Sequence, residues 1–140
     1  EVAEKTGLKV LHIADVTAEA IIQKNKNIVG LLGTDFTMSE DFYKKRLNDK
    51  YNIEVMIPEK KERERVHRVI YDELCCGIVK SQSKAEFITI INNLKDKGAE
   101  GVILGCTEIP MLIEQKDLDI RVFDSMKLHA DAIVKEMLNV

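Results

Sequence analysis

The fold is decided by the stretch Gly101-Val102-Ile103-Leu104-Gly105-Cys106-Thr107-Glu108, in which a short apolar run enters a Gly-Cys turn. Residues 101–104 have the length and composition of a strand that is buried on both faces, as in parallel sheets. Four more runs of this character cover residues 8–13, 28–32, 53–57 and 120–123. We therefore expect five short strands in a parallel sheet.

Segments with the apolar spacing of helices separate these runs. The predicted helices cover residues 15–25, 38–50, 59–77, 83–98 and 125 onward. Asp15 or Thr17 is expected to cap the first helix, Ser83 or a neighbour the fourth, and Asp124 or Ser125 the last. The last helix is expected to turn one set of side chains inward: Met126, Ala130, Ile133, Val134 and Met137. Strands that alternate with helices predict an α/β fold, a parallel sheet flanked by helices.

Composition narrows the functional class. The chain has 140 residues, of which 45% are hydrophobic, and this suffices for one domain with its own core. Its net charge of −3, with Lys and Glu interspersed along helix faces, offers no basic surface for nucleic acid. No apolar run approaches the roughly 18 residues that cross a bilayer, and the first residues lack a secretory layout. We therefore expect a cytoplasmic protein without membrane contact.

The three cysteines are an odd number, which disfavours a disulfide framework. No His and Cys spacing matches a zinc site, and no Gly-rich phosphate or dinucleotide motif is present. We therefore expect neither a metal nor a cofactor.

The loop after residues 101–104 is the first candidate site, because parallel sheets bind ligands at the carboxyl ends of their strands. Gly105 allows close approach of the backbone, and the helix expected next would aim unpaired N–H groups at an anion. The dipole of that helix would favour the thiolate of Cys106, the form that acts as nucleophile or base. The alternative is that Cys106 is a small buried apolar side chain. Cys75 and Cys76 follow no strand and are expected to be packing or surface residues.

A second strand end reads Gly33-Thr34-Asp35-Phe36-Thr37. Its hydroxyls and amides could hold a carboxylate or phosphate, or Thr34 or Thr37 could be an ordinary helix cap. Lys80 could offer a positive charge to an anionic substrate, or be a solvated lysine. His67 lies on a charged helix and is expected at the surface.

The chain resembles the cofactor-independent aspartate/glutamate racemase family at its second cysteine motif, which reads here Gly101-Val-Ile-Leu-Gly-Cys106-Thr-Glu-Ile-Pro110. Three other segments resemble that family in order and spacing: Leu11-His-Ile-Ala-Asp-Val-Thr17, Gly30-Leu-Leu-Gly-Thr-Asp-Phe-Thr-Met38, and Ile70-Tyr-Asp-Glu-Leu74 followed by Gly77 and Lys80. Phe123-Asp124 and the helix after it resemble the family's closing element. The resemblance spans essentially the whole chain.

This resemblance implies two Rossmann-like three-layer domains that face each other across a cleft, each with one catalytic cysteine. One thiolate removes the Cα proton of an amino acid and the other thiol donates a proton to the opposite face, without pyridoxal phosphate. Cys106 would be one of these groups. The residues implied to bind substrate are Thr34, Thr37, Lys80, Thr107 and Glu108.

The family's first domain has a Gly-Gly-rich opening and a Pro-Cys-Asn-Thr motif, and nothing in this chain matches either. By resemblance, residues 1–118 are the second α/β domain, and residues 119–140 are a closing strand and helix that pack on the first domain. The whole protein would racemise an acidic amino acid, aspartate being the first candidate, with a homodimer as an open option. The isolated chain would be inactive.

Two alternatives stay open at this point. One is a sibling reaction of the superfamily, such as maleate isomerisation or arylmalonate decarboxylation, which would use Cys106 on another anionic substrate. The other is a non-catalytic α/β binding module in which Cys106 is inert.

Overall fold

The computed structural model describes residues 2–138 of the chain. Its strands are β1 (Ile28–Leu32), β2 (Glu54–Met56), β3 (Gly101–Leu104) and β4 (Arg121–Asp124). Its α-helices are α1 (Val2–Thr6), α2 (Ile13–Gln23), α3 (Asp35–Ser39), α4 (Asp41–Tyr51), α5 (Lys60–Asp72), α6 (Ser81–Asp96) and α7 (Ser125–Leu138). Three short 3-10 helices complete the described chain: η1 (Leu74–Cys76), η2 (Ile109–Met111) and η3 (Gln115–Asp117).

The four strands form one parallel sheet in the order β2-β1-β3-β4. Leu32 pairs with Leu104, and Leu104 pairs with Asp124, so the central strands end at the same level. Their following loops, which begin at Gly33 and Gly105, therefore emerge side by side at the carboxyl edge of the sheet. The predicted parallel α/β architecture is confirmed.

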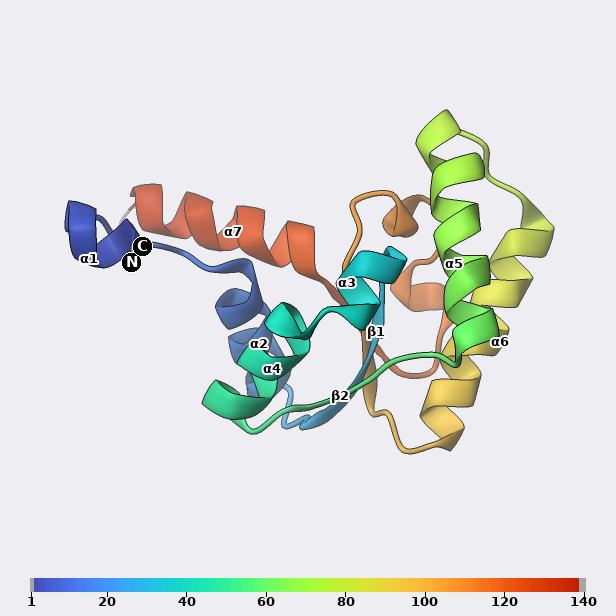
Figure 1. The fold of residues 1–140 in the computed structure, drawn as a ribbon, viewed down its shortest axis with the longest axis horizontal. Coiled ribbons are helices and arrows are strands. Elements are labelled where there is room, and N and C mark those ends of the chain that lie inside the picture. The colour runs from blue at the N-terminus through green and yellow to red at the C-terminus, as the bar shows by residue number, and fades with distance from the viewer. Residues whose placement is uncertain (1, 139–140) are drawn as a thin grey trace.

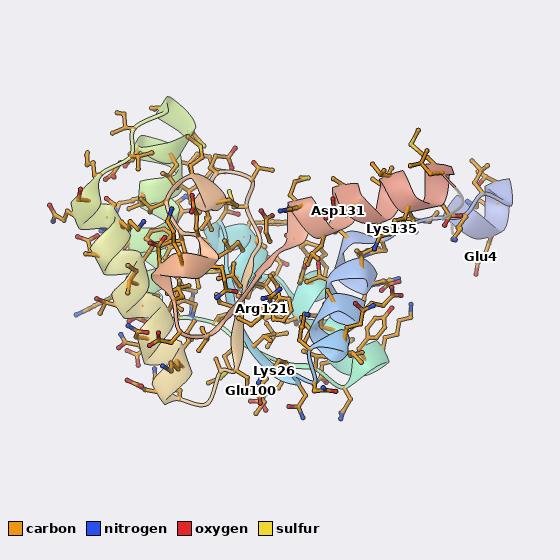
Figure 2. The ribbon with its side chains drawn as sticks, turned by 180° about the vertical axis from the view of Figure 1, so that it is seen from behind. Glu4, Lys26, Glu100, Arg121, Asp131 and Lys135 are labelled. Atoms are coloured by element: carbon orange, nitrogen blue, oxygen red, sulfur yellow. The ribbon has the colours of Figure 1, made fainter. Side chains whose placement is uncertain are left out.

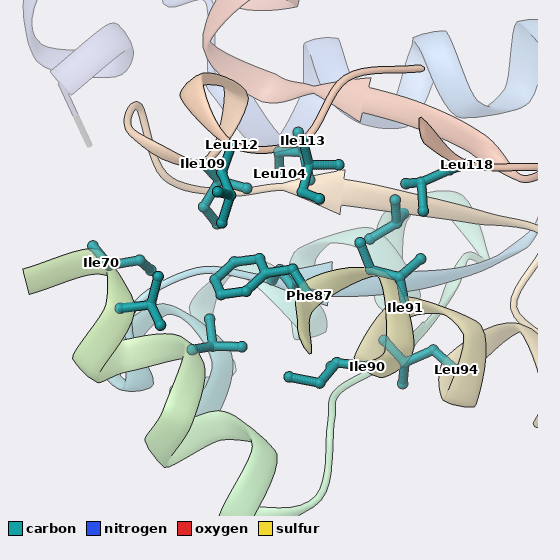
Figure 3. Packing of buried hydrophobic residues seen from close by; sticks show 14 of the residues in the cluster. Ile70, Phe87, Ile90, Ile91, Leu94, Leu104, Ile109, Leu112, Ile113 and Leu118 are labelled. Atoms are coloured by element: carbon teal, nitrogen blue, oxygen red, sulfur yellow. The ribbon is translucent and has the colours of Figure 1, made fainter. Parts of the chain in front are cut away.

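Helices cover both faces of this sheet, which makes the three layers that the resemblance implied (Figure 1). On one face α5 and α6 pack on β3 around Phe87 and Ile91 of α6. The segment that follows β3 closes this core with three buried apolar side chains, Ile109, Leu112 and Ile113 (Figure 3). On the other face α2 and α4 enclose a second core. The loop of Cys106 is thus fixed from below by buried side chains.

Residues 8–13 were predicted as a strand, and this prediction is wrong. The segment is irregular up to His12 and makes no strand pairing with the sheet. Leu8 and Val10 are 67% and 51% exposed, so its apolar residues find no sheet neighbour to pack against. Residues 8–13 thus have the composition of a strand, but no neighbouring strand pairs with them.

Helix α2 begins at Ile13, two residues before the expected start. His12 is its cap, and its Nδ1 accepts a hydrogen bond from the backbone N–H of Ala14 at 3.1 Å. Asp15 instead accepts two hydrogen bonds from Arg46 of α4. Thr17 is buried and donates to the carbonyl of Ile13. Thr17 also accepts a hydrogen bond from the hydroxyl of Tyr43 in α4, so both expected caps join α2 to α4 instead.

Other helix ends also differ from expectation. The helix expected over residues 38–50 is divided, because Glu40 has extended backbone between α3 and α4. Ser83 is not a cap, since α6 begins at Ser81; its buried hydroxyl donates to Glu73. Asp124 does cap α7, because its Oδ1 accepts from the N–H of Lys127 at 3.1 Å.

The helix expected directly after Gly105 and Cys106 is absent from the described chain. Two three-residue 3-10 helices, η2 and η3, follow instead, and Pro110 is one of the residues of η2. Ile109 of η2 is buried, as are Leu112 and Ile113 directly after it. Gln115, the first residue of η3, then bonds the backbone of Ile120 and Val122 at the free edge of β4.

Helix α7 extends away from the sheet beside α1 (Figure 1). Its expected inward stripe is wrong for this chain, because Met126, Ile133, Val134 and Met137 are exposed. Figure 2 shows Asp131 and Lys135 on the same projecting helix, whereas Lys26 and Glu100 lie together at the opposite end of the sheet. The outer limits of the two predicted domains, residue 1 and residues 139–140, lie outside the described residues.

Candidate functional site

The loop that carries Cys106 is held in place by its neighbours at the carboxyl edge. The hydroxyl of Ser125 donates to the carbonyl of Leu104 at 2.9 Å, and the N–H of Gly105 donates to the carbonyl of Leu32 at 2.7 Å. These bonds extend the pairing of β1, β3 and β4 by one residue beyond the strands. Cys106 therefore leaves the sheet from a fixed position.

Gly105 brings the two candidate loops into contact. A Cβ at this position would lie 3.1 Å from the carbonyl oxygen of Leu32 and 3.3 Å from Cγ2 of Thr37. A side chain here would push the loops apart, since both distances are tighter than usual for a Cβ contact. The glycine thus allows the Thr34–Thr37 loop to pack directly against the residue that precedes Cys106.

The thiol of Cys106 is half-buried, and its Sγ donates a hydrogen bond to Oε2 of Glu108 at 2.8 Å. Burial, and next the bond to Glu108, raise the pKa of Cys106 to about 11. The same bond, followed by one from the Thr107 hydroxyl, lowers the pKa of the Glu108 carboxyl. At neutral pH the pair is therefore a protonated thiol beside a carboxylate.

This protonation state contradicts the expectation that a helix dipole favours the thiolate. That expectation required an α-helix starting at Cys106, and η2 is too short to supply one. Burial is the larger cause of the protonated state, and Glu108, two positions along the chain, adds to it. The sequence pattern of a thiol and a carboxylate in one tight turn is the signal that could have indicated this pairing.

Thr34 and Thr37 also lie together, on the loop after β1. The Thr34 hydroxyl accepts from the N–H of Thr37 at 3.4 Å, and the two hydroxyl oxygens are 3.2 Å apart. Thr34 is the cap of α3, as the simpler alternative proposed. Thr37 also lies next to the Cys106 loop, through its contact with Gly105, and Thr34 is bonded to Thr37. The residue that caps α3 is therefore also part of the candidate site.

Within residues 2–138, the structure shows no hydrogen bond or ion pair between Lys80 and the loops of Thr34 or Cys106. Its Nζ lies 3.4 Å from Oε1 of Glu73, a buried carboxylate that also accepts from Ser83. The Lys80 side chain is half-exposed. Its predicted role in substrate binding stays a prediction.

Cys75 and Cys76 lie in η1 and are exposed. Partial loss of hydration at its sulfur, and next the charge of Glu108, raise the pKa of Cys75. Cys75 in turn is the last of the causes that raise the pKa of Cys106. The two thiol turns are therefore near each other at one end of the molecule. No motif or spacing in the chain indicated this proximity.

A hollow of about 470 Å³ lies beside the site. Leu104 and Pro110 line it, together with Asp124 and Lys127 at the start of α7. Cys106 is not among its lining residues, so the thiol lies outside it. Within residues 2–138 no three His, Cys, Asp or Glu side chains are arranged to hold a metal ion, and no helix there combines the length and apolarity needed to cross a membrane.

Similar structures have the same architecture. A candidate Asp/Glu racemase from Yersinia pestis matches 98% of this chain with 42% identity and a TM-score of 0.93. An aspartate racemase homologue from Pyrococcus horikoshii matches 96% with 38% identity and a TM-score of 0.90. The aspartate racemase of Picrophilus torridus matches 90% with 28% identity and a TM-score of 0.66. The chain spans 60%, 58% and 52% of the lengths of these proteins.

The model of one protein family matches the chain over residues 1–133, which include both candidate loops and most of α7. That family is described as the Asp/Glu/hydantoin racemases. The sequence resemblance and the parallel α/β fold agree with this match. The chain belongs to the Asp/Glu/hydantoin racemase family.

Proposed function

We propose that this chain is part of a racemase that acts on an acidic amino acid, aspartate first, without pyridoxal phosphate. The observation that carries the proposal is the 2.8 Å hydrogen bond from Cys106 to Glu108, in a loop that contacts Thr37. Family membership and the names of the relatives support the reaction class and the acidic substrate.

Cys106 is suited to proton transfer in both directions. As acid, its S–H bond breaks and the proton moves to the Cα carbanion, which leaves a thiolate. As base, the thiolate removes a Cα proton and becomes the thiol again. Glu108 favours the thiol form, because a negative charge beside the sulfur disfavours the thiolate. The chain in its resting state therefore offers a proton donor at this position.

A Cα proton is very weakly acidic, so the charge that develops on the substrate carboxylate needs hydrogen-bond donors. Thr34, Thr37 and Thr107 are the proposed donors. The first two lie on the loop that packs against Gly105, and Thr107 follows the thiol directly. The donors follow β1 and the thiol follows the neighbouring strand β3. A substrate bound across these two strand ends would contact both.

We further propose that the second thiol comes from a first domain of the whole protein, and that this domain packs against α7. The chain spans about 60% of the two most similar solved structures described above, so those relatives have room for such a domain. The exposed apolar side chains of α7 give it a surface to cover: Met126, Ile133, Val134, Met137 and Leu138.

Deuterium exchange tests this function. The full-length protein is incubated with L-aspartate or L-glutamate in deuterated water, and incorporation at Cα is followed by NMR together with the appearance of the D form. We expect exchange and racemisation with at least one of the two. Absence of exchange with both would refute the acidic-substrate assignment, and a requirement for added pyridoxal phosphate would refute the thiol mechanism.

A further inference from the structure

His67 was expected at the surface, yet its ring is held on two sides. Nδ1 of His67, on α5, accepts a hydrogen bond from the backbone N–H of Asp35 at 3.1 Å. The ring also lies against Tyr71, with 4.7 Å between ring centroids. Because the amide of Asp35 is the donor, Nδ1 carries no proton in this arrangement. Asp35 is the first residue of α3 and directly follows Thr34.

Helix α3 needs such an anchor. It has five residues, which is far too short for a helix that is stable by itself. Met38 is buried in the core and fixes one side of it, whereas Phe36 is exposed. From α5, Arg63 places its Nε 3.5 Å from Oδ1 of Asp35, one turn before His67. Figure 1 shows α3 between the end of β1 and α5.

The anchored segment is the one that contacts the Cys106 loop. Thr34 and Thr37 share hydrogen bonds within this turn, and Cγ2 of Thr37 lies under Gly33 and Gly105. A change in the position of Asp35 moves both hydroxyls, because each belongs to the same turn. Its anchor on α5 therefore sets where the two hydroxyls lie relative to Cys106.

We propose that His67 is a positioning residue for substrate binding: the hydrogen bond from the Asp35 amide to its Nδ1 keeps the Thr34–Thr37 loop docked beside Cys106. This inference rests on the proposed function, in which Thr34 and Thr37 hold the substrate carboxylate. His67 acts through Asp35 and touches no reacting atom, so it governs binding more than proton transfer.

Two variants of the full-length protein distinguish the role of His67 as a hydrogen-bond acceptor from the role of its ring in packing. His67→Phe keeps a ring against Tyr71 and removes the acceptor, whereas His67→Asn places an amide oxygen near the position of Nδ1 and removes the ring. We expect His67→Phe to raise the KM for aspartate about two- to tenfold, the range for loss of one neutral hydrogen bond, with a smaller change in kcat. His67→Asn should recover most of the wild-type KM. A general packing defect would instead impair both variants.

Hydrogen–deuterium exchange at the Asp35 amide supplies a second readout that needs no catalysis. We expect faster exchange in His67→Phe than in the wild-type protein and near wild-type protection in His67→Asn. Equal protection in all three proteins overturns the inference, as does a KM for His67→Asn as high as that of His67→Phe. If the wild-type protein exchanges no Cα proton of aspartate, the proposed function fails, and the Asp35 amide alone then decides whether His67 anchors the loop.

Discussion

The chain presents thiols in two turns that differ in almost every physical respect. Cys106 follows β3, is half-buried and donates to Glu108. Cys75 and Cys76 lie in η1 between two helices and are exposed, and Cys76 makes only a weak 3.7 Å contact to the carbonyl of Tyr71. A strand end fixes the first thiol against a carboxylate, whereas a helix end leaves the second pair facing solvent. The surroundings of Cys106, rather than thiol chemistry as such, therefore distinguish it from Cys75 and Cys76.

The largest expected difference between the turns is catalytic. Cys106→Ser should lower kcat/KM for aspartate racemisation by the full-length protein at least about a hundredfold, since a positioned acid–base group contributes roughly 10²–10⁴. Cys76→Ser should stay within about twofold of wild type. Steady-state racemisation assays measure both. Wild-type activity in Cys106→Ser would mean that the two turns do not differ in function.

Removal of the carboxylate tests what sets the Cys106 turn apart. Glu108→Gln should lower kcat/KM about ten- to hundredfold, because a hydrogen bond to a charged group contributes roughly 1.5–3 kcal/mol. It should also lower the pKa of Cys106 from about 11, since Glu108 raises it, but not to the ordinary thiol value, because burial is the larger cause. Alkylation of Cys106 as a function of pH, in a background with Cys75 and Cys76 changed to Ser, gives the midpoint. Glu114→Gln, which removes a surface carboxylate paired with Lys116, is the matched control and should change neither quantity.

The rate at which Cys106 is alkylated at neutral pH should show a smaller effect. The expected slow rate is opposite to the prediction from the sequence, in which the thiolate of Cys106 is favoured. A thiol whose pKa is about 11, against the reference of 9.0, has little thiolate at pH 7. Its higher intrinsic nucleophilicity offsets about half of this deficit on a logarithmic scale, which leaves roughly a tenfold lower rate. Iodoacetamide should therefore modify Cys106 about tenfold more slowly than a reference thiol, and more slowly than the exposed Cys76, as peptide mass spectrometry would show. Faster labelling of Cys106 would mean that its thiolate is favoured after all.

The sequence predicted the strands at residues 28–32 and 101–104 with their observed bounds, because buried parallel strands are continuous apolar runs. It failed at residues 8–13, where a run of similar composition lacks strand neighbours. The site was predictable where it follows strand ends, as for Cys106 and Thr34. The anchor at His67 was not, since it joins residues 32 positions apart, and the protonation state of Cys106 depends on burial that only the packed core creates.

The smallest expected effects concern one glycine beside each turn, and they differ in cause. Gly105 is needed for space, so Gly105→Ala should destabilise the protein by roughly 1–3 kcal/mol through overpacking against Leu32 and Thr37. Gly77 has open space but a φ of +72°, so Gly77→Ala should cost about 1 kcal/mol of backbone strain. Urea unfolding of the full-length protein measures both.

Asparagine separates these two causes, because it tolerates a positive φ better than alanine but is larger. Gly77→Asn should be more stable than Gly77→Ala, whereas Gly105→Asn should be less stable than Gly105→Ala. The same order of stability at both positions would mean that a single cause acts at both glycines. Close approach would then no longer distinguish the Cys106 turn from the turn of Cys75 and Cys76.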